Sequence, residues 1–490
     1  MIDFWQYKFQ RPVFIVLSVL AASFFAILLV SAQLPALLLV LTLAVSIPVV
    51  VLLLRNQLWG LKLAILTIVP GNLWRLSLGT QEQGGAAILI TDLVMPLIIL
   101  TWLFNKITAQ RELRRNSINL PLIIFTLIAL AALLQGFHIL SVTGTLTVKE
   151  ALVSSMYWLR WVEYAFLFFI TADVVKSRAD VKSLMNFLLW NGVLVAIGGF
   201  IQLIIMPDFT EFAILYGWDP HQGRLLGAFF DPNFIATFFA VLECIALALL
   251  LESKTWPERL VLLLQIATMG AALILTFSRT GYLAMLIGLF VIGLIRTPKL
   301  LFASLLIFAL ALSSSPRALS RITEGLSFDE TAMKRVESWT KALRLIPNWP
   351  VLGVGYNTLM YVQEDLGTAD AFDVNNRSGV ENSLLTVLLT TGFLGLLAFL
   401  GLYLGMIKQC YLNMQNKLLS PQLQVLSIGI LAAILAFLGS SVTLNSLFYP
   451  FLLVPVWILA GTAAALPYLG DRSQETGDGG SNSKFNIQNS

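Results

Sequence analysis

The chain has 490 residues, of which 58% are apolar and only 12% are charged, and its formal net charge is +4. Soluble domains carry about 25% charged residues, so this composition excludes an ordinary soluble protein and indicates a polytopic protein of a lipid bilayer. The two cysteines lie far apart and predict no disulfide framework. The sequence has neither a Cys/His cluster with metal-ligand spacing nor a phosphate-binding loop. We therefore expect no metal, no cofactor and no nucleic-acid partner.

Apolar runs long enough to cross a bilayer recur along almost the whole chain. We predict an all-α membrane protein with about 12–14 transmembrane helices and one large helical loop outside the membrane. The run at 58–78 contains Pro70 and Gly71, and the runs at 281–295 and 299–313 are short. The predicted spans lie near residues 12–30, 35–54, 58–78, 86–104, 119–137, 150–171, 184–206, 233–252, 260–276, 281–295, 299–313, 383–407, 423–443 and 448–467.

Basic residues predict the orientation of the chain, because cytoplasmic loops carry an excess of Lys and Arg. Every second loop is basic, so both termini are expected in the cytoplasm. Arg75, Lys149, Arg224 and Arg279 fall on the expected outer side, where orientation does not require them. The basic residues of the expected inner loops are Lys8, Arg11, Arg55, Lys106, Arg111, Arg114, Arg115, Lys176, Arg178, Lys182, Lys254, Arg259, Arg296, Lys299, Lys408 and Lys417.

The chain is expected to have four parts. Residues 1–313 form the N-terminal transmembrane helices, and 314–382 form an extracytoplasmic loop with an amphipathic helix. Residues 383–469 form the C-terminal transmembrane helices. The tail 470–490 is rich in Gly, Ser, Asn and Asp and is predicted to be a disordered cytoplasmic end.

The segment GRLLGAFFDPNF places Arg224 before a turn on the expected outer side. Asp231 can cap the helix that follows, and Pro232 can occupy its first position. Arg224 is either a solvated residue of a capped loop or a ligand for phosphate oxygens, which a planar guanidinium binds well. On the second interpretation, Arg224 and Asn233 would bind substrate.

The segment FSRTGYLA places Arg279 at a tight outward turn between two apolar runs. An arginine between two spans so closely joined is costly unless it is paired or lines a watery cavity. Arg279 therefore either binds carbonyl groups of its own loop or takes part in catalysis.

The long loop contains an expected amphipathic helix from Glu330 to Ile346. Arg335 lies on the flank of its apolar face, whereas its other basic residues lie on or towards the far side. If the helix packs over a groove, Arg335 points inward as a catalytic candidate. The alternative is an arginine whose stem lies over apolar surface. The apolar face consists of Ala332, Val336, Trp339, Leu343 and Ile346.

After this helix, the turn NWPVLGVGYN contains Gly353 and Gly355, which we expect to let the chain bend sharply at the membrane surface. Tyr356 in this turn is a candidate substrate-binding residue. Glu381 and Asn382 follow where the chain re-enters the bilayer, and Asn382 is a second such candidate. Glu381 is either a carboxylate favoured by the helix dipole or a general base above a polar groove.

Arg160 and Glu163 lie three residues apart on one predicted helix and can pair. Ions inside a membrane are candidates for function, yet a pair on one helix can also serve only to fasten neighbouring helices. Both interpretations stay open for this pair. Asp92 and Glu243 also lie in or near apolar runs.

Four segments resemble those of the O-antigen ligase and polymerase superfamily of bacterial envelope glycosyltransferases. They lie between roughly Arg224 and Gly405, and their order, spacing and common outward side make the combination specific. The resemblance implies a multi-helix membrane fold that is GT-C-like. The segments are RLLGAFFDPNF, FSRTGYLA, RVESWTKALRLIPNWPVLGVGYNTL and ENSLLTVLLTTGFLGLLAFL.

The resemblance also implies an inverting, metal-independent glycosyltransferase. Such enzymes take a glycan from a polyprenyl (undecaprenyl-type) diphosphate and pass it to a hydroxyl of a lipid or glycan acceptor, on the outer side of the cytoplasmic membrane. By similarity, Arg224, Arg279 and Arg335 would hold the diphosphate. A leaving diphosphate needs several cationic donors, which stabilise the charge that develops as the sugar–phosphate bond breaks.

Glu381 departs from the pattern of the family, whose ligases typically carry a histidine there to activate the acceptor hydroxyl. A carboxylate is a weaker base than an imidazole unless burial strengthens it. The departure speaks against ligation to a lipid A core. A polymerase, a ligase for another acceptor and a diverged member of the family all remain open.

Two other classes of function fit parts of the sequence. One is a transporter of a small anion such as bicarbonate, and the other is a non-catalytic protein that binds a lipid-linked glycan. A carrier should place charged sites near the midplane of the membrane, and only Arg160, Glu163 and Glu243 fit that requirement. The outward arginines therefore favour the transferase.

Overall fold

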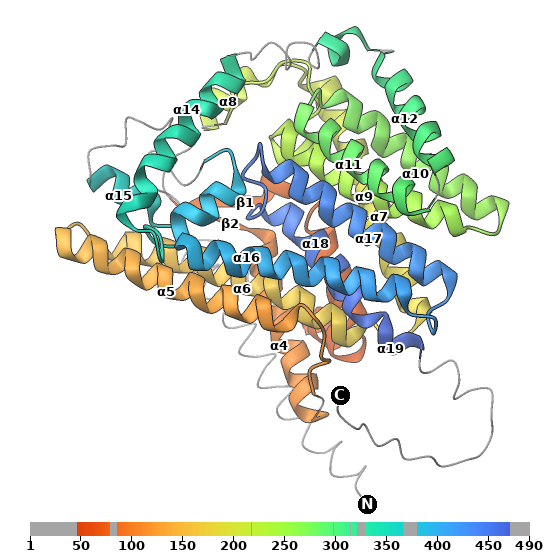
Figure 1. Ribbon diagram of the computed structural model, residues 1–490, viewed down its shortest axis with the longest axis horizontal. Coiled ribbons are helices and arrows are strands. Elements are labelled where there is room, and N and C mark those ends of the chain that lie inside the picture. The colour runs from red at the N-terminus through yellow and green to blue at the C-terminus, as the bar shows by residue number, and fades with distance from the viewer. Residues whose placement is uncertain are drawn as a thin grey trace, which may run out of the picture.

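The computed structural model describes residues 47–78, 86–110, 112–216, 218–296, 298–313, 315–320, 330–365 and 380–470. Regular structure in these ranges is almost entirely helical (Figure 1). The α-helices are α3 (Leu58–Leu66), α4 (Ile90–Thr108), α5 (Asn119–Thr143), α6 (Val148–Val174), α7 (Arg178–Ile205), α8 (Thr210–Tyr216), α9 (Pro232–Glu252), α10 (Trp256–Leu275), α11 (Arg279–Arg296), α12 (Pro298–Ser313), α14 (Glu330–Leu345), α15 (Leu359–Asp365), α16 (Ser383–Gln415), α17 (Pro421–Ser441), α18 (Pro450–Ala465) and α19 (Pro467–Gly470). Three short 3-10 helices are η1 (Gly71–Trp74), η3 (Gly227–Phe229) and η4 (Ile346–Asn348).

Within the described residues, 8 helices are long and apolar enough to cross a bilayer, namely α4, α5, α7, α9, α10, α11, α16 and α17. α18 is apolar but shorter. These helices confirm the prediction of an all-α polytopic membrane protein. The span predicted at 12–30 lies outside the described residues, as do most of the span at 35–54 and the tail after Gly470.

The span predicted at 58–78 is wrong. α3 ends at Leu66, and the chain then turns through η1 into β1 (Arg75–Leu78), which pairs antiparallel with β2 (Ala86–Leu89). Pro70 has no N–H to donate to a continuing helix, and Gly71 adopts a φ of +48°. A Cβ on Gly71 would lie 2.5 Å from the carbonyl oxygen of Ala228. This break turns an apolar run into a β hairpin that carries Arg75.

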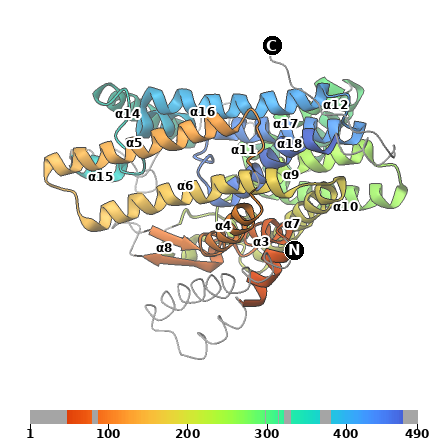
Figure 2. The same ribbon diagram turned by 90° about the horizontal axis from the view of Figure 1, so that it is seen from below.

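The core of the molecule is built around α9 and α18. α9 packs against α10, α11 and α17, and α18 packs against α6. α5 and α16 pack side by side and run along one edge of the molecule in both ribbon views (Figures 1 and 2). Every residue of α18 is buried, which is possible because its sequence is apolar all round.

The turn after α14 is fastened to a kink in α16. Gly392 interrupts α16 with a φ of +67°, and the backbone N–H groups of Val354 and Gly355 donate to the carbonyl groups of Leu389 and Thr390 at 2.9 and 3.2 Å. Gly355 has a φ of +113°. The predicted glycine turn is therefore confirmed, and it holds Tyr356 and the residue after it in place.

Replacing Gly355 by alanine is expected to lower the stability of the protein by about 2 kcal/mol, because the positive φ is strained and the core is close-packed there. A Cβ would lie 2.6 Å from the Cα of Gly136. Thermal unfolding of the purified protein in detergent measures the effect. Gly401→Ala is the control, since a Cβ there meets nothing within 4 Å. Equal unfolding temperatures for the two variants would contradict the expectation.

α14 corresponds to the amphipathic helix that was predicted in the long loop. Ala342 and Ile346 are buried in a cluster with residues of α16, and Arg335 is turned inward. Val336 and Leu343, predicted on the buried face, are 45% and 56% exposed. That part of the prediction is wrong, because α14 packs through a narrower stripe and keeps a second apolar side facing away from the protein.

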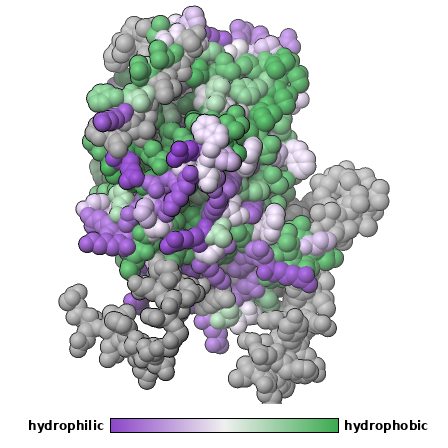
Figure 3. All heavy atoms as spheres, turned by 90° about the vertical axis from the view of Figure 1, so that its right-hand side faces the viewer, coloured by the Kyte–Doolittle hydropathy of each residue, from purple (hydrophilic) through white to green (hydrophobic). Residues whose placement is uncertain are grey.

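The end of the molecule on the right of Figure 1 carries many hydrophilic side chains (Figure 3). Seen from the right of Figure 1, where α10, α16 and α17 end, the surface is hydrophobic over much of its area and hydrophilic in its lower half (Figure 3). Exposed ion pairs occur in the loops that were predicted to be cytoplasmic, such as Lys182 with Glu258 at 2.6 Å. α14 and α15 lie on the left in Figure 1, away from this end.

Candidate functional site

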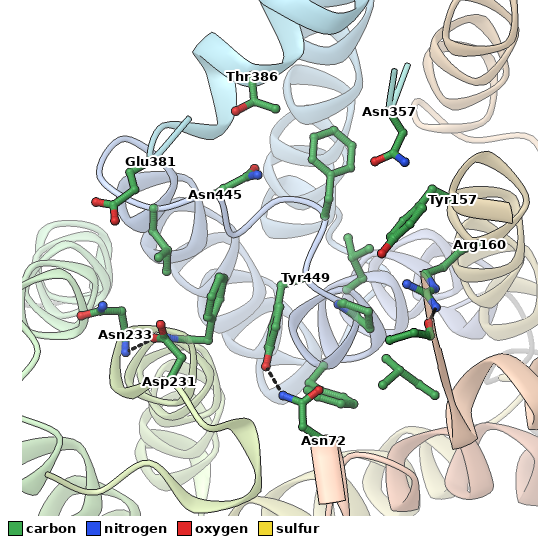
Figure 4. Close-up of a pocket in the computed structure, with 18 of the residues that line it drawn as sticks. Asn72, Tyr157, Arg160, Asp231, Asn233, Asn357, Glu381, Thr386, Asn445 and Tyr449 are labelled. Atoms are coloured by element: carbon green, nitrogen blue, oxygen red, sulfur yellow. Dashed lines mark hydrogen bonds between the residues drawn. The ribbon is translucent and has the colours of Figure 1, made fainter. Parts of the chain in front are cut away.

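A cavity of about 400 Å³ lies among the β hairpin, α6, the start of α9, the turn after α14 and the start of α18 (Figure 4). Its wall combines charged, amide and aromatic side chains, a mixture suited to a polar ligand with apolar faces. The charged residues of the wall are Arg75, Arg160, Asp219, Asp231 and Glu381, and the amides are Asn72, Asn233, Asn357 and Asn445.

One side of the cavity is held by a hydrogen-bond network around Tyr449. Asn72 Nδ2 donates to the carbonyl oxygen of Phe229 at 2.8 Å and to Tyr449 Oη at 3.0 Å. Tyr449 Oη donates to the same carbonyl oxygen at 3.0 Å, and its ring stacks on that of Phe234 at 3.9 Å between centroids. Burial raises the pKa of the Tyr449 phenol well above its usual range, so the hydroxyl stays protonated and remains a donor.

Arg160 lies at another side of the cavity. Its Nε donates to Asp92 Oδ1 at 2.9 Å, and its Nη2 donates to Asp92 Oδ2 and to the carbonyl oxygen of Ala87. The guanidinium also lies over the ring of Tyr157 at 4.9 Å. These contacts fasten α6 to α4 and to the β hairpin.

The predicted pair of Arg160 with Glu163 is wrong. Asp92 on α4 is the partner, because its carboxylate accepts two hydrogen bonds from one guanidinium, a geometry stronger than a single contact along one helix. Arg160 lines the cavity and Glu163 does not.

Asp231 caps α9, as predicted. Its Oδ1 accepts from the backbone N–H groups of Asn233 at 2.6 Å and Phe234 at 3.0 Å. Burial raises the pKa of the Asp231 carboxyl to about 6, although the two N–H bonds and the charge of Arg224 act in the opposite direction. The side chain of Asn233 accepts a hydrogen bond from Ser278 Oγ at 2.7 Å.

Arg224 fixes the turn that precedes α11. Its Nε donates to the carbonyl oxygen of Thr276 at 2.8 Å, and its Nη2 donates to that of Phe277 at 3.3 Å. Phe277 has a φ of +49°, and Arg279 follows as the first residue of α11. Neither arginine is among the described residues that line the cavity. Ser278 of this turn contacts the cavity wall, because its Oγ donates a hydrogen bond to the side chain of Asn233.

Arg335 and Glu381 join α14 to the edge of the cavity. Arg335 Nε donates to Glu381 Oε2, and Trp339 Nε1 donates to the carbonyl oxygen of Glu381 at 3.3 Å. The side chain of Arg335 is 17% exposed and that of Glu381 is 37% exposed. Asn382 caps α16 by accepting from the backbone N–H of Leu385 at 3.0 Å.

Residues 264–400 match a protein-family model described as O-antigen ligase. This match supports the O-antigen ligase/polymerase superfamily for the matched part of the chain. The resemblance noted in the sequence is thereby confirmed, and Arg279, Arg335, Tyr356 and Glu381 all lie in the matched region. No curated protein matches the chain. The family supports a glycosyltransferase-like enzyme with lipid-linked glycan substrates, and the apolar helices support a multi-pass membrane protein.

The cavity brings together four of the predicted site residues, namely Arg160, Asn233, Tyr356 and Glu381. Arg335 contacts it through Glu381. Tyr356 is buried against Phe448, with 5.9 Å between ring centroids, and burial raises the pKa of its phenol well above the usual range. The predicted residues that do not line the cavity are Glu163, Arg224, Arg279, Arg335 and Asn382.

Several wall residues of the cavity were not predicted from the sequence. Asn72 was assigned to a membrane span that does not form. Asn445 and Tyr449 lie in the short connection between α17 and α18, whose polar residues were a usable signal between two apolar runs. Tyr157 could not be recognised as a wall residue from the sequence, because tyrosines are common where an apolar helix meets the membrane interface.

Proposed function

We propose that this protein transfers a glycan from a polyprenyl-diphosphate carrier to a hydroxyl of a lipid or glycan acceptor. One observation carries the proposal: the Arg335–Glu381 pair stands at the edge of a polar cavity, inside the region that matches the O-antigen ligase family. The pair joins a cation that can bind phosphate to a carboxylate that can accept a proton.

The diphosphate of the donor is bound by Arg335 and Arg279. A diphosphate oxygen replaces Glu381 as the partner of Arg335, which releases the carboxylate. Arg224 supports Arg279 because it holds the carbonyl groups of the turn before α11, and it adds a positive charge beside the leaving group. Asn233 and Tyr356 contribute polar groups on the cavity wall for the glycan.

In the reaction, the acceptor hydroxyl oxygen attacks the anomeric carbon from the face opposite the diphosphate. The bond from that carbon to the phosphate oxygen breaks, and its electron pair goes to the diphosphate. The arginines stabilise this developing charge without metal. The anomeric configuration is inverted, and the hydroxyl proton passes to a carboxylate of the cavity, for which Glu381 is the prediction from the sequence.

The arrangement of the helices supports a site on the outer face of the cytoplasmic membrane. α14 and α15 lie on the left of the ribbon view, and the connection between α16 and α17, which was predicted to be a basic inner loop, lies on the right (Figure 1). Since basic loops face the cytoplasm, the loop with Arg335 faces outward and both termini face inward.

The function is tested with the purified protein in proteoliposomes, a glycan on polyprenyl diphosphate as donor, and an extract of the source envelope as acceptor. Consumption of the diphosphate donor, but not of the same glycan on polyprenyl monophosphate, is expected. Donor binding without consumption would indicate the non-catalytic alternative. Uptake of labelled bicarbonate by the same proteoliposomes, without donor consumption, would indicate the transporter.

A further inference from the structure

A second carboxylate faces the same cavity and is differently placed from Glu381. Asp231 lines the cavity at the start of α9, and Figure 4 shows it with Asn233 on the side of the cavity where Glu381 also lies, away from Arg160 and Tyr157. We propose that Asp231 is the general base that takes the proton from the acceptor hydroxyl. This inference rests on the proposed transferase function and assigns a catalytic residue to it.

The capping contacts leave one oxygen of Asp231 for a substrate. Oδ1 accepts both backbone hydrogen bonds, from Asn233 and Phe234. Oδ2 has no hydrogen-bond partner within the part of the chain that the structure describes. Because two N–H groups of a helix N-terminus hold the carboxylate, it is rigidly placed. A positioned base on a rigid element is a requirement of proton transfer in the transition state.

Glu381 is less suited to this role. Its side chain is 37% exposed at the edge of the cavity, and its carboxylate loses Arg335 as a partner when the diphosphate binds, so it is less firmly placed than Asp231. Glu381 then holds Arg335 in the empty site until the diphosphate binds. Asp231 and Glu381 thus have separate tasks, which is the usual result of different environments.

Burial of the Asp231 carboxyl brings its titration into the range of a general base. Burial is the largest influence and raises its pKa to about 6, with a further rise from Asp219 and an opposing effect of Arg224. Tyr449 faces it as a neutral phenol. The other titratable groups of the cavity are Arg75, Arg160, His221 and Glu381. A base is most effective when its pKa lies near the working pH.

The transfer step moves one proton to Asp231 and one electron pair to the diphosphate. As the acceptor oxygen bonds to the anomeric carbon, its proton moves to Asp231 Oδ2. The electron pair of the broken carbon–oxygen bond leaves with the diphosphate at Arg279 and Arg335. Water takes the proton from Asp231 after the products have left.

Asp231→Asn is the matched test, because asparagine caps a helix as well as aspartate but accepts no proton. We expect transfer to fall by about 10²- to 10⁴-fold, with the unfolding temperature and the binding of the polyprenyl-diphosphate donor unchanged. Glu381→Gln is expected to strengthen donor binding, because the diphosphate no longer has to displace a carboxylate from Arg335, and to keep the pH dependence of the wild type. Asp231→Ser, which also caps, should behave like Asp231→Asn.

The pH profile separates a base from a merely structural residue. In the wild type, kcat/KM rises as the pH increases through about 6, where Asp231 loses its proton, and stays level above it. This rise is expected to disappear in Asp231→Asn. A wild-type rate in Asp231→Asn, or loss of the rise in Glu381→Gln instead, would overturn the assignment. Both results require donor consumption by the wild type, and its absence would overturn the transferase function itself.

Discussion

Replacing Arg335 by alanine is expected to reduce glycan transfer by about 10³-fold, a loss typical of removing a cation that stabilises a leaving phosphate. Arg335 is turned inward from α14 and contacts Glu381 at the edge of the cavity. The truncated side chain would leave the diphosphate without a donor on this side. Initial rates with a polyprenyl-diphosphate glycan measure the effect.

Lys341→Ala is the matched control for this prediction. Lys341 lies on the same helix and pairs with Glu337 at 2.6 Å, away from the cavity wall. Its replacement is expected to leave the rate within about twofold of the wild type, since exposed pairs contribute little. Arg335→Lys should recover only part of the rate, because lysine lacks the planar fork. Equal rates for Arg335→Ala and Lys341→Ala would contradict the proposal that Arg335 binds the diphosphate.

Replacing Asp92 by alanine is expected to destabilise the protein by about 3–5 kcal/mol, the usual cost of breaking a buried pair. The side chains of Arg160 and Asp92 are only 14% and 13% exposed. Without Asp92, the guanidinium loses a bidentate partner, and Tyr164 Oη loses the carboxylate to which it donates at 3.2 Å. Thermal unfolding and the yield of monodisperse protein in detergent measure the loss.

The double replacement Asp92→Asn with Arg160→Gln removes both charges together, so it is expected to recover part of this stability. Lys182→Ala is the control for an exposed pair. Lys182 is 66% exposed and its partner Glu258 is 44% exposed, so a change below about 1 kcal/mol is expected. An Asp92→Ala protein as stable as Lys182→Ala would show that the pair does not fasten α4 to α6.

Apolar runs predicted most of the helices because the bilayer requires long stretches without charge. The span predicted at 233–252, for example, corresponds to α9. The run at 58–78 was misassigned, since composition does not reveal that Pro70 and Gly71 end a helix early and start a hairpin. The apolar character of this run was correctly recognised, but the break in its helix was not predicted.

The candidate site was predictable where one helix carried the information. The position of Arg335 on the flank of α14 predicted that it points inward, and the structure pairs it with Glu381. Partners distant in the chain were not predictable. Asp92 is 68 positions from Arg160, and Asn72 is 377 positions from Tyr449, so only the packing of the helices brings them together.

The most direct test is a single-turnover assay with a polyprenyl-diphosphate glycan, comparing the wild type with the double variant Arg279→Ala and Arg335→Ala. Both proteins must first show the same unfolding temperature in detergent. We predict that the wild type releases polyprenyl diphosphate and forms the glycosylated acceptor, and that the double variant does neither. Equal release of polyprenyl diphosphate by the two proteins would contradict transfer at this cavity.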